Sequence, residues 1–333
     1  MRRCEALVLA LGLAACSGKH ESAKHEAAPV AVASGSSGSA VAAVTEEGGG
    51  AAAACTDLPF ATTTPVPEAS GAAWMELGGK PALLVVSDSG NKGAYAIIDA
   101  ETGDTKEQGS LPLGKGAGED IEGLAEQDGK IYGITSSGWI RVWKRDGAGF
   151  QLVDGPYPLG PIDLPAKSAS GGNKPPAGDG MVCDGNSTNC GRNYEGLCLV
   201  PRDPRDGLNP LLCQGFAASK ADGHIYCLML GEKGRFEVKH DKAIAIDEGG
   251  RVADCAFSPE GRLVVGNNLF GLAKVFLVED WMAPEKATVT QVGMFGPGFP
   301  ETIAAKGDVI YRLSDTGGSP SLMAKFRCPA IER

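Results

Sequence analysis

One short segment recurs five times along this chain. A polar residue stands at the head of an apolar run in "ASGAAW", "DIEGLA", "NYEGLCL", "ADCAF" and "PETIA". Aligning these segments puts five residues in one position: Ser70, Glu122, Glu195, Asp254 and Glu301. Each is followed by an apolar strand, a turn and further strands, in units of about 45 to 60 residues, which is typical of β-propeller blades. With 48 Gly and 21 Pro supplying turns, the repeat predicts an all-β protein with five four-stranded blades.

The last unit is one strand short, and the segment that starts at Cys55 has no unit of its own. We expect this N-terminal strand to close the last blade as its outer strand. Antiparallel pairing would then bring Cys55 next to Cys328, and a disulfide could lock the ring. In the chain-entropy model such a bond is worth up to about 4 to 5 kcal/mol.

The stretch 161–192 is too rich in Gly, Pro, Ser and Lys for a blade. It is interpreted as an inserted loop, with Cys183 and Cys190 closing a small ring inside it. The alternative is a six-bladed propeller with a cryptic blade in this stretch.

The N-terminus has the pattern of an exported protein. Residues 1–15 read as a signal peptide, and "LAAC" ending at Cys16 is similar to a bacterial lipobox, which implies lipidation of that cysteine. A plain secretory signal is the alternative. Residues 16–54 are Ala, Gly, Ser and Glu without a period, which indicates a tether. With the propeller at 55–333, we expect a lipoprotein of the bacterial outer membrane, anchored through its lipid.

The composition of the chain restricts the classes of partner that we expect. The formal net charge of −10 argues against nucleic acid, and we expect a monomer that binds a small molecule or an envelope protein. The eight cysteines from Cys55 onward favour disulfides in an exported chain. Four of them sit on adjacent predicted strands, and their pairing stays open: Cys198, Cys213, Cys227 and Cys255.

In a propeller the first strand of each blade lines the channel, and the end of the second strand lies at the same face. That face would gather the aligned residues with Asp88, Ser137, Asn268 and Asp315. Like charges about 5 Å apart cost roughly 3 kcal/mol per pair at an effective dielectric constant of 20. Hard oxygen donors favour calcium, so the predicted metal ligands are Glu122, Glu195, Asp254 and Glu301. A purely structural ring is the alternative.

A catalytic apparatus is harder to predict. His224, after a turn on the same face, is the best-placed general base, although a histidine beside a turn is more often merely solvated. The sequence contains no G-x-S-x-G, Walker loop or H-E-x-x-H.

These segments resemble the SdiA-regulated and esterase-like phytase group of β-propellers, whose blades carry similar S-G-L-A and D-x-E-G-[IL]-A signatures. The resemblance spans about Ser70 to Phe326. It implies a cation site on the channel axis, carried over onto Glu122, Glu195 and Glu301. The "DCAF" segment departs from the pattern at Asp254. Three functions follow as hypotheses: a calcium-binding propeller that holds a ligand, a calcium-dependent hydrolase of ester, lactone or phosphate bonds, and a structural envelope protein.

Overall fold

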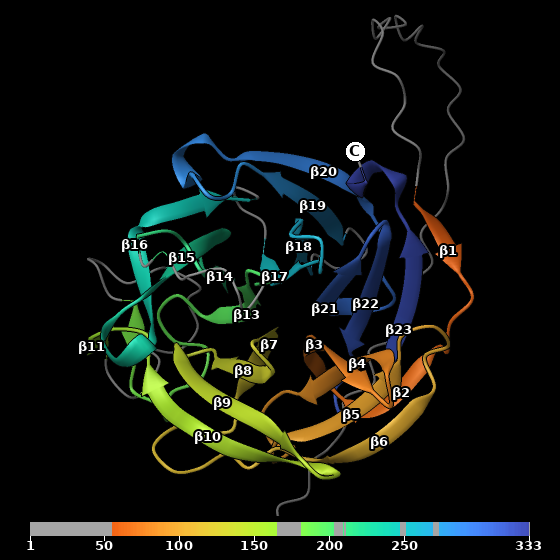
Figure 1. Cartoon of the computed structure of the whole chain (residues 1–333), viewed down its shortest axis with the longest axis horizontal. Coiled ribbons are helices and arrows are strands. Elements are labelled where there is room, and N and C mark those ends of the chain that lie inside the picture. The colour runs from red at the N-terminus through yellow and green to blue at the C-terminus, as the bar shows by residue number, and fades with distance from the viewer. Residues whose placement is uncertain are drawn as a thin grey trace, which may run out of the picture. The chain divides into compact units, whose positions relative to one another are not determined.

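The structure is a computed structural model, and it describes residues 55–164, 181–202, 209, 211–246, 251–268 and 273–332. The predicted signal peptide, Cys16 and the tether therefore lie outside the described residues. Five sheets surround a central axis, with β3, β7, β13, β17 and β21 nearest to it (Figure 1). The protein is a five-bladed β-propeller, as the repeat predicts. The sixth blade that we considered for 161–192 does not occur in the described part of that stretch.

Four blades are simple antiparallel meanders of consecutive strands. Blade 1 contains β3 (Ala69–Leu77), β4 (Lys80–Ser87), β5 (Ala94–Asp99) and β6 (Thr105–Ser110). Blade 2 contains β7 (Ile121–Gln127), β8 (Lys130–Thr135), β9 (Trp139–Asp146) and β10 (Gly149–Pro158). Blade 3 contains β13 (Tyr194–Leu199), β14 (Gly215–Ser219), β15 (His224–Leu230) and β16 (Phe236–Ala245). Blade 4 contains β17 (Val252–Phe257), β18 (Leu263–Asn267), β19 (Lys274–Glu279) and β20 (Thr288–Met294).

Blade 5 joins the two ends of the propeller. It combines β21 (Phe299–Lys306), β22 (Val309–Asp315) and β23 (Pro320–Arg327) with β1 (Thr56–Leu58) and β2 (Thr63–Pro67), which both pair with β23. Thr56 lies opposite Arg327, and Cys55 forms a disulfide with Cys328 across 273 residues of sequence. Both the closing strand and its disulfide are confirmed.

The insertion after blade 2 has some structure of its own. Two short parallel strands, β11 (Ile162–Leu164) and β12 (Val182–Cys183), pair with each other, and Cys183 forms the expected disulfide with Cys190. Three 3-10 turns complete the elements: η1 (Glu232–Gly234), η2 (Pro284–Lys286) and η3 (Pro329–Ile331).

The other four cysteines of the described residues pair as Cys198–Cys255 and Cys213–Cys227. The first bond joins the inner strands of blades 3 and 4, and the second lies within blade 3. Four disulfides are characteristic of an extracellular or periplasmic protein. No helix among the described residues is long and apolar enough to cross a membrane.

The second residue of the E-G repeat sets how closely the inner strands pack. A Cβ on Gly71 would lie 2.7 Å from the backbone nitrogen of Leu124, and a Cβ on Gly123 would lie 2.4 Å from that of Leu197. Real Cβ atoms do not approach backbone this closely, so glycine allows each inner strand to lie against the next one. The repeat therefore encodes both a carboxylate and the close packing that brings the carboxylates together.

Candidate functional site

A β-bulge at the start of each inner strand presents one residue to the mouth of the channel. In blade 2 Ile121 pairs with Thr135 and Gly123 with Ile134, so that Glu122 is left unpaired between them. The same shift in register occurs in every blade. The bulge residues in chain order are Ser70, Glu122, Glu195, Ala253 and Glu301.

This register corrects the sequence alignment at blade 4. Val252 pairs with Asn267 and Asp254 with Gly266, so Ala253 occupies the bulge and Asp254 takes the place of the glycines. Asp254 is buried, and its two carboxylate oxygens accept the backbone N–H groups of Cys255 at 2.8 Å and Ile303 at 3.0 Å. The geometry thus gives Asp254 a role in joining blades 4 and 5.

The ends of the second strands form another layer at the mouth. In each blade, this layer contains the residue that directly follows the partner of the residue before the bulge. These residues are Asp88, Ser136, Lys220, Asn268 and Asp315. Ser137, which the sequence analysis favoured, lies one residue further on and exchanges a 2.9 Å hydrogen bond with the Thr135 hydroxyl. Ser136 instead donates to Oδ2 of Asp120. Asp315 accepts the backbone N–H of Gly317.

Lys220 places a positive charge between two carboxylates on one side of the mouth. Its ammonium donates to Oε2 of Glu195 at 2.7 Å and to Oε1 of Glu301 at 3.3 Å, and Asn268 also donates to that Glu301 oxygen at 2.8 Å. Both glutamates are buried. Because blade 4 carries only Ala253 at its bulge, no long side chain from that position competes with Lys220 between blades 3 and 5. A side chain therefore supplies charge that we had expected from a metal ion.

On the other side of the mouth three carboxylates come together. Asp88, Asp120 and Glu122 each offer an oxygen, and these oxygens lie within 4.8 Å of one another. Ser70 donates to Oε2 of Glu122 at 2.7 Å. Burial raises the pKa of Asp120, and the positive charge of buried Arg141 opposes that rise. The Arg141 guanidinium donates its hydrogen bonds to backbone carbonyl oxygens, including that of Leu113 at 2.7 Å. We name Asp88, Asp120 and Glu122 the carboxylate trio.

Burial and mutual repulsion shape the protonation of the mouth. Burial, with the charges of Asp120 and other carboxylates, raises the pKa of Asp88 to about 6. Burial and the charge of Glu195 raise the pKa of Glu122 well above its ordinary range. Burial would lower the pKa of Lys220, but the charges of Glu195 and Glu301 outweigh it and raise that pKa. The trio therefore holds protons tightly, while Lys220 stays charged.

Two buried amide oxygens at the mouth lack a hydrogen-bond partner among the described residues. Asn193 donates from its amide nitrogen to Glu195 at 2.8 Å, as Asn268 does to Glu301, and these bonds fix the orientation of both amides. The Oδ1 atoms of Asn193 and Asn268 are left buried and unpaired. Such atoms are costly to bury and can accept hydrogen bonds from a ligand.

His224 is the first residue of β15 and follows shortly after Lys220, a residue of the mouth layer, in the sequence. Its Nδ1 lies 2.8 Å from the carbonyl oxygen of Asp222 and 3.5 Å from its carboxylate. Arg192 and Tyr226 both donate to the other carboxylate oxygen, at 2.7 and 2.6 Å. The hydrogen bond from His224 to Asp222 raises the pKa of the histidine. Asp222 thus orients a partly exposed imidazole.

The sequence pattern does not identify four polar residues of the mouth, which are Asp120, Ser136, Asn193 and Lys220. Asp120 immediately precedes the inner strand of blade 2, and Ser136 and Lys220 directly follow second strands. Asp120 and Lys220 carry a detectable signal, because each is a charged residue at a predicted strand end that faces the channel. The choice of Ser136 over Ser137 depends on a one-residue register, which flips a side chain to the opposite face.

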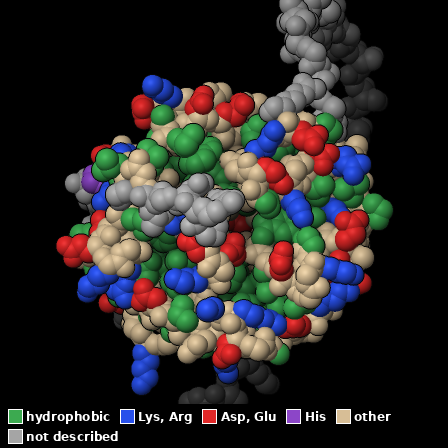
Figure 2. All heavy atoms as spheres, viewed as in Figure 1, with side chains coloured by type: hydrophobic (Ala, Val, Ile, Leu, Met, Phe, Trp, Pro, Cys, Tyr) green, Lys and Arg blue, Asp and Glu red, His purple; other side chains and the backbone are tan. Residues whose placement is uncertain are grey.

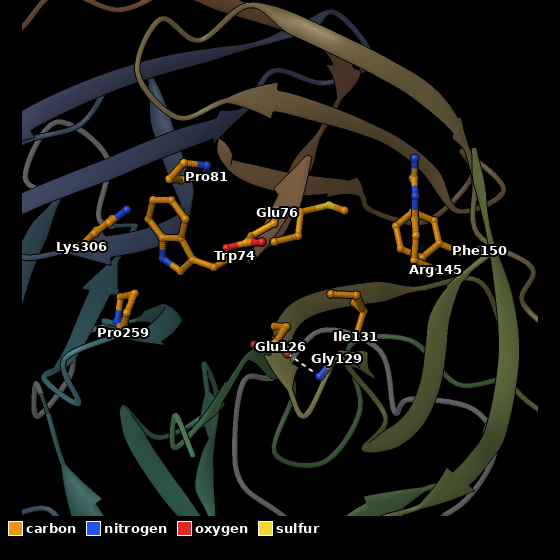
Figure 3. A pocket seen from close by; sticks show the side chains of 11 residues that line it. Trp74, Glu76, Pro81, Glu126, Gly129, Ile131, Arg145, Phe150, Pro259 and Lys306 are labelled. Carbon is orange, nitrogen blue, oxygen red and sulfur yellow. Dashed lines mark hydrogen bonds between the residues drawn. The ribbon is translucent and has the colours of Figure 1, made fainter. Parts of the chain in front are cut away.

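Cavities occur at the other end of the channel, where inner strands end and second strands begin. One of about 540 Å³ has Trp74, Met75 and Phe150 among its walls. Figure 3 shows Lys306 and Pro81 beside the Trp74 ring, and Arg145 against Phe150. A second cavity of about 290 Å³ shares Trp74 with the first and reaches Leu124 and Leu197 on inner strands. Figure 2 shows acidic and basic side chains interspersed on the face that it draws.

No protein-family model matches this sequence, and no curated protein matches it. The resemblance to the SdiA-regulated and esterase-like phytase group therefore stays an expectation.

Solved structures do match the chain at low identity. Glutaminyl cyclase from Myxococcus xanthus matches with a TM-score of 0.47 and 13% identity, over 83% of this chain and 97% of that one. The PQQ-bound aldose sugar dehydrogenase from Streptomyces coelicolor matches with a TM-score of 0.44 and 17% identity, over 82% and 98%. A putative 6-phosphogluconolactonase from Bacteroides uniformis matches with a TM-score of 0.39 and 15% identity, over 78% and 67%. At this level of similarity the activities of these proteins are not transferred, and the class rests on the strand order: a five-bladed propeller with a carboxylate-lined channel mouth.

Proposed function

We propose that the channel mouth binds one calcium ion between Asp88, Asp120 and Glu122 and uses it to hold a small ligand. The observation that carries this proposal is the carboxylate trio, whose oxygens lie within 4.8 Å of one another. Lys220 donates to Glu195 and Glu301, and among the described residues no hydrogen bond joins its ammonium to the trio. A divalent ion would relieve the repulsion that remains.

The donor atoms of the trio suit calcium better than a softer metal. Calcium takes six to eight oxygen ligands, including bidentate carboxylates, at about 2.3 to 2.6 Å. The trio offers only oxygens, and neither histidine nor thiolate belongs to it. Ser70 and Ser136 each hold one carboxylate by a hydrogen bond, which orients those oxygens before an ion arrives.

The same mouth suggests the chemistry of the ligand. A bound cation would attract an anionic or strongly polar oxygen of the ligand. The unpaired amide oxygens of Asn193 and Asn268 can accept hydrogen bonds from hydroxyl or amine groups of the same ligand. A small polyhydroxylated acid combines both features. Binding without turnover is the function that these contacts support, because they describe groups that would hold a ligand at the mouth.

The proposal is tested by thermal unfolding of the chain from Cys55 onward, stripped with EDTA and titrated with calcium. We expect a saturable rise in the melting temperature, which disappears in Glu122→Gln. Glu301→Gln is the matched control, since Glu301 occupies the same bulge position outside the trio, and it should keep the calcium response. An unchanged melting temperature in the parent chain, or an equal loss in both variants, would contradict the proposal.

A calcium-dependent hydrolase is the second candidate, favoured by the pairing of His224 with Asp222. A histidine oriented by a carboxylate is a common general base. A panel of carboxylic esters, lactones and phosphate esters, assayed with and without calcium, tests this candidate. Calcium-dependent turnover that is lost in His224→Gln with the fold intact would support it. A panel without turnover would leave the binding function.

The cellular setting is a separate proposal, which rests on the sequence of residues 1–54. We propose that the propeller is held at the bacterial outer membrane through lipid on Cys16, where a purely structural role in the envelope would also be compatible with the fold. Mass spectrometry of the mature N-terminus should reveal an acylated cysteine, absent in Cys16→Ser. An unmodified N-terminus from a plain signal peptide would contradict the anchor.

A further inference from the structure

A cleft between blades 5 and 1 gathers positive charge on a chain with a net charge of −10. It encloses about 650 Å³ at the end of the channel opposite the carboxylate trio. Its charged lining comprises four cations, Lys80, Lys306, Lys325 and Arg327, and two carboxylates, Asp99 and Glu101. The imbalance is local, so it indicates a partner that is small and anionic rather than a polyanion, which the whole chain would repel.

Strand register explains how three of the cations reach one wall. Lys325 and Arg327 are two residues apart on β23, so both side chains leave the same face of the sheet. Arg327 lies opposite Val309, which pairs with Lys306 on β21. Lys325 lies opposite Tyr311. Blade 5 therefore presents a row of cations with Tyr311 and Val309 between them, facing the β3–β4 and β5–β6 turns of blade 1.

Lys325 is the unusual member of this row. The residue is only 5% exposed, and its ammonium lies 5.8 Å from the ring centres of both Phe60 and Tyr311. It donates to the carbonyl oxygen and to Oε2 of Glu101, each at 3.1 Å. The Glu101 side chain is 88% exposed, so the carboxylate that pairs with this buried ammonium among the described residues is one that solvent can draw away.

The other carboxylate of the cleft is already satisfied. Asp99 accepts the backbone N–H groups of Glu101 and Thr102, at 2.9 and 3.1 Å, and lies 4.0 Å from Lys106. Those contacts lower its pKa and keep it charged. It therefore does not compensate Lys325, and the Glu101 carboxylate occupies the position that an external anion would take.

We propose that this cleft binds a small organic anion, whose carboxylate or phosphate replaces the Glu101 carboxylate at Lys325 while its apolar body lies against Tyr311 and Pro81. Lys306 adds charge at the entrance, as does Arg327, whose guanidinium lies 3.4 Å from Oδ2 of Asp308. A buried ammonium next to aromatic faces favours a monoester or an aryl acid over the bare inorganic ion, since only the former can use the apolar wall. This site is independent of the proposed calcium site.

The test is a calorimetric titration of the chain from Cys55 onward with phenyl phosphate and with inorganic phosphate, at constant ionic strength and with EDTA present. We expect saturable binding of phenyl phosphate, at least several-fold tighter than that of inorganic phosphate. Lys325→Met should weaken binding by about tenfold or more, because it removes a charge-assisted hydrogen bond. Lys144→Gln, an exposed lysine of β9 outside the cleft, is the matched control and should bind like the parent.

Two further variants keep the test decisive if Lys325→Met does not fold. Arg327→Gln should weaken binding several-fold. Glu101→Gln should tighten it, since the ammonium loses its internal carboxylate. If Lys325 only ties blade 5 to blade 1, Glu101→Gln will alter stability without altering affinity. That result, or the absence of saturable phenyl phosphate binding in the folded parent, would overturn the proposal.

Discussion

Lys220 of blade 3 and Glu301 of blade 5 meet across the channel mouth, with Nζ 3.3 Å from Oε1. The same ammonium lies 2.7 Å from Glu195. The Lys220 ammonium therefore pairs with two buried carboxylates, one on blade 3 and one on blade 5, and these blades are not neighbours in the ring. This contact gives one side of the mouth a cation of its own, whereas the carboxylate trio on the other side has no hydrogen-bonded cation among the described residues.

Removal of the Lys220 charge should destabilise the propeller. Lys220→Met leaves Glu195 and Glu301 buried without a cation, and breaking a buried pair in this way costs about 3 kcal/mol or more at neutral pH. At pH 5 the loss should be smaller, since the carboxyls can then take up protons. Urea unfolding at both pH values measures this. Lys220→Arg is the charge-retaining control, and an equal loss at both pH values would contradict the electrostatic explanation.

The pH dependence of stability should carry the signature of the trio. The pKa of Asp88 is raised to about 6 from an ordinary value of 3.8, so the folded chain binds this proton more tightly than the unfolded chain. The stabilisation is complete below about pH 4 and is lost as the pH rises through 6. Asp88→Asn removes it, so the difference in unfolding free energy between parent and variant in EDTA should change between pH 4 and 7. A difference that is independent of pH would show that Asp88 has no raised pKa.

Asp254 should matter for stability and not for calcium. Both of its oxygens accept backbone N–H groups, and Asp254→Asn places an amide donor against one of them. The expected loss is about 2 kcal/mol in chemical denaturation. Calcium affinity should equal that of the parent chain. A variant of normal stability with weakened calcium binding would return Asp254 to the set of metal ligands.

Gly123→Ala tests the packing of the inner strands. The added Cβ would lie 2.4 Å from the backbone nitrogen of Leu197, and overpacking against backbone typically costs about 1 to 3 kcal/mol or more. Gly149→Ala is the control, because its Cβ would meet nothing nearer than 3.9 Å. In denaturant unfolding, the free energy of unfolding of Gly123→Ala should be far lower than that of the control. Equal stabilities would mean that the E-G repeat does not set the spacing of the blades.

Much of the architecture could be predicted because it is repeated. Each blade carries the same order of turn, bulge residue and apolar strand, so five weak signals reinforce one another. The closure followed from an unpaired strand at each end of the chain, and Cys55 and Cys328 then had to be neighbours. The pairing of Cys198 with Cys255 could not be predicted, since it depends on which faces of two inner strands meet.

The site was harder to predict because its register varies by single residues. In "VADCA" the acidic residue stands one place later than in "IEGLA", and the alignment followed the charge rather than the apolar positions. Lys220 lies on blade 3, and no local pattern reveals that its side chain reaches Glu301. That contact requires a long side chain on one blade and a small bulge residue, Ala253, on the blade between.

The most direct test of the central claim is an isothermal titration of the EDTA-stripped propeller with calcium at pH 7, in two buffers of different ionisation enthalpy. We predict that one ion binds per chain and that protons are released from the trio as the ion replaces them. Affinity should fall as the pH is lowered through 6 and should be lost in Glu122→Gln. Absence of binding heat in both buffers, or binding that Glu122→Gln leaves unchanged, would contradict calcium binding at the carboxylate trio.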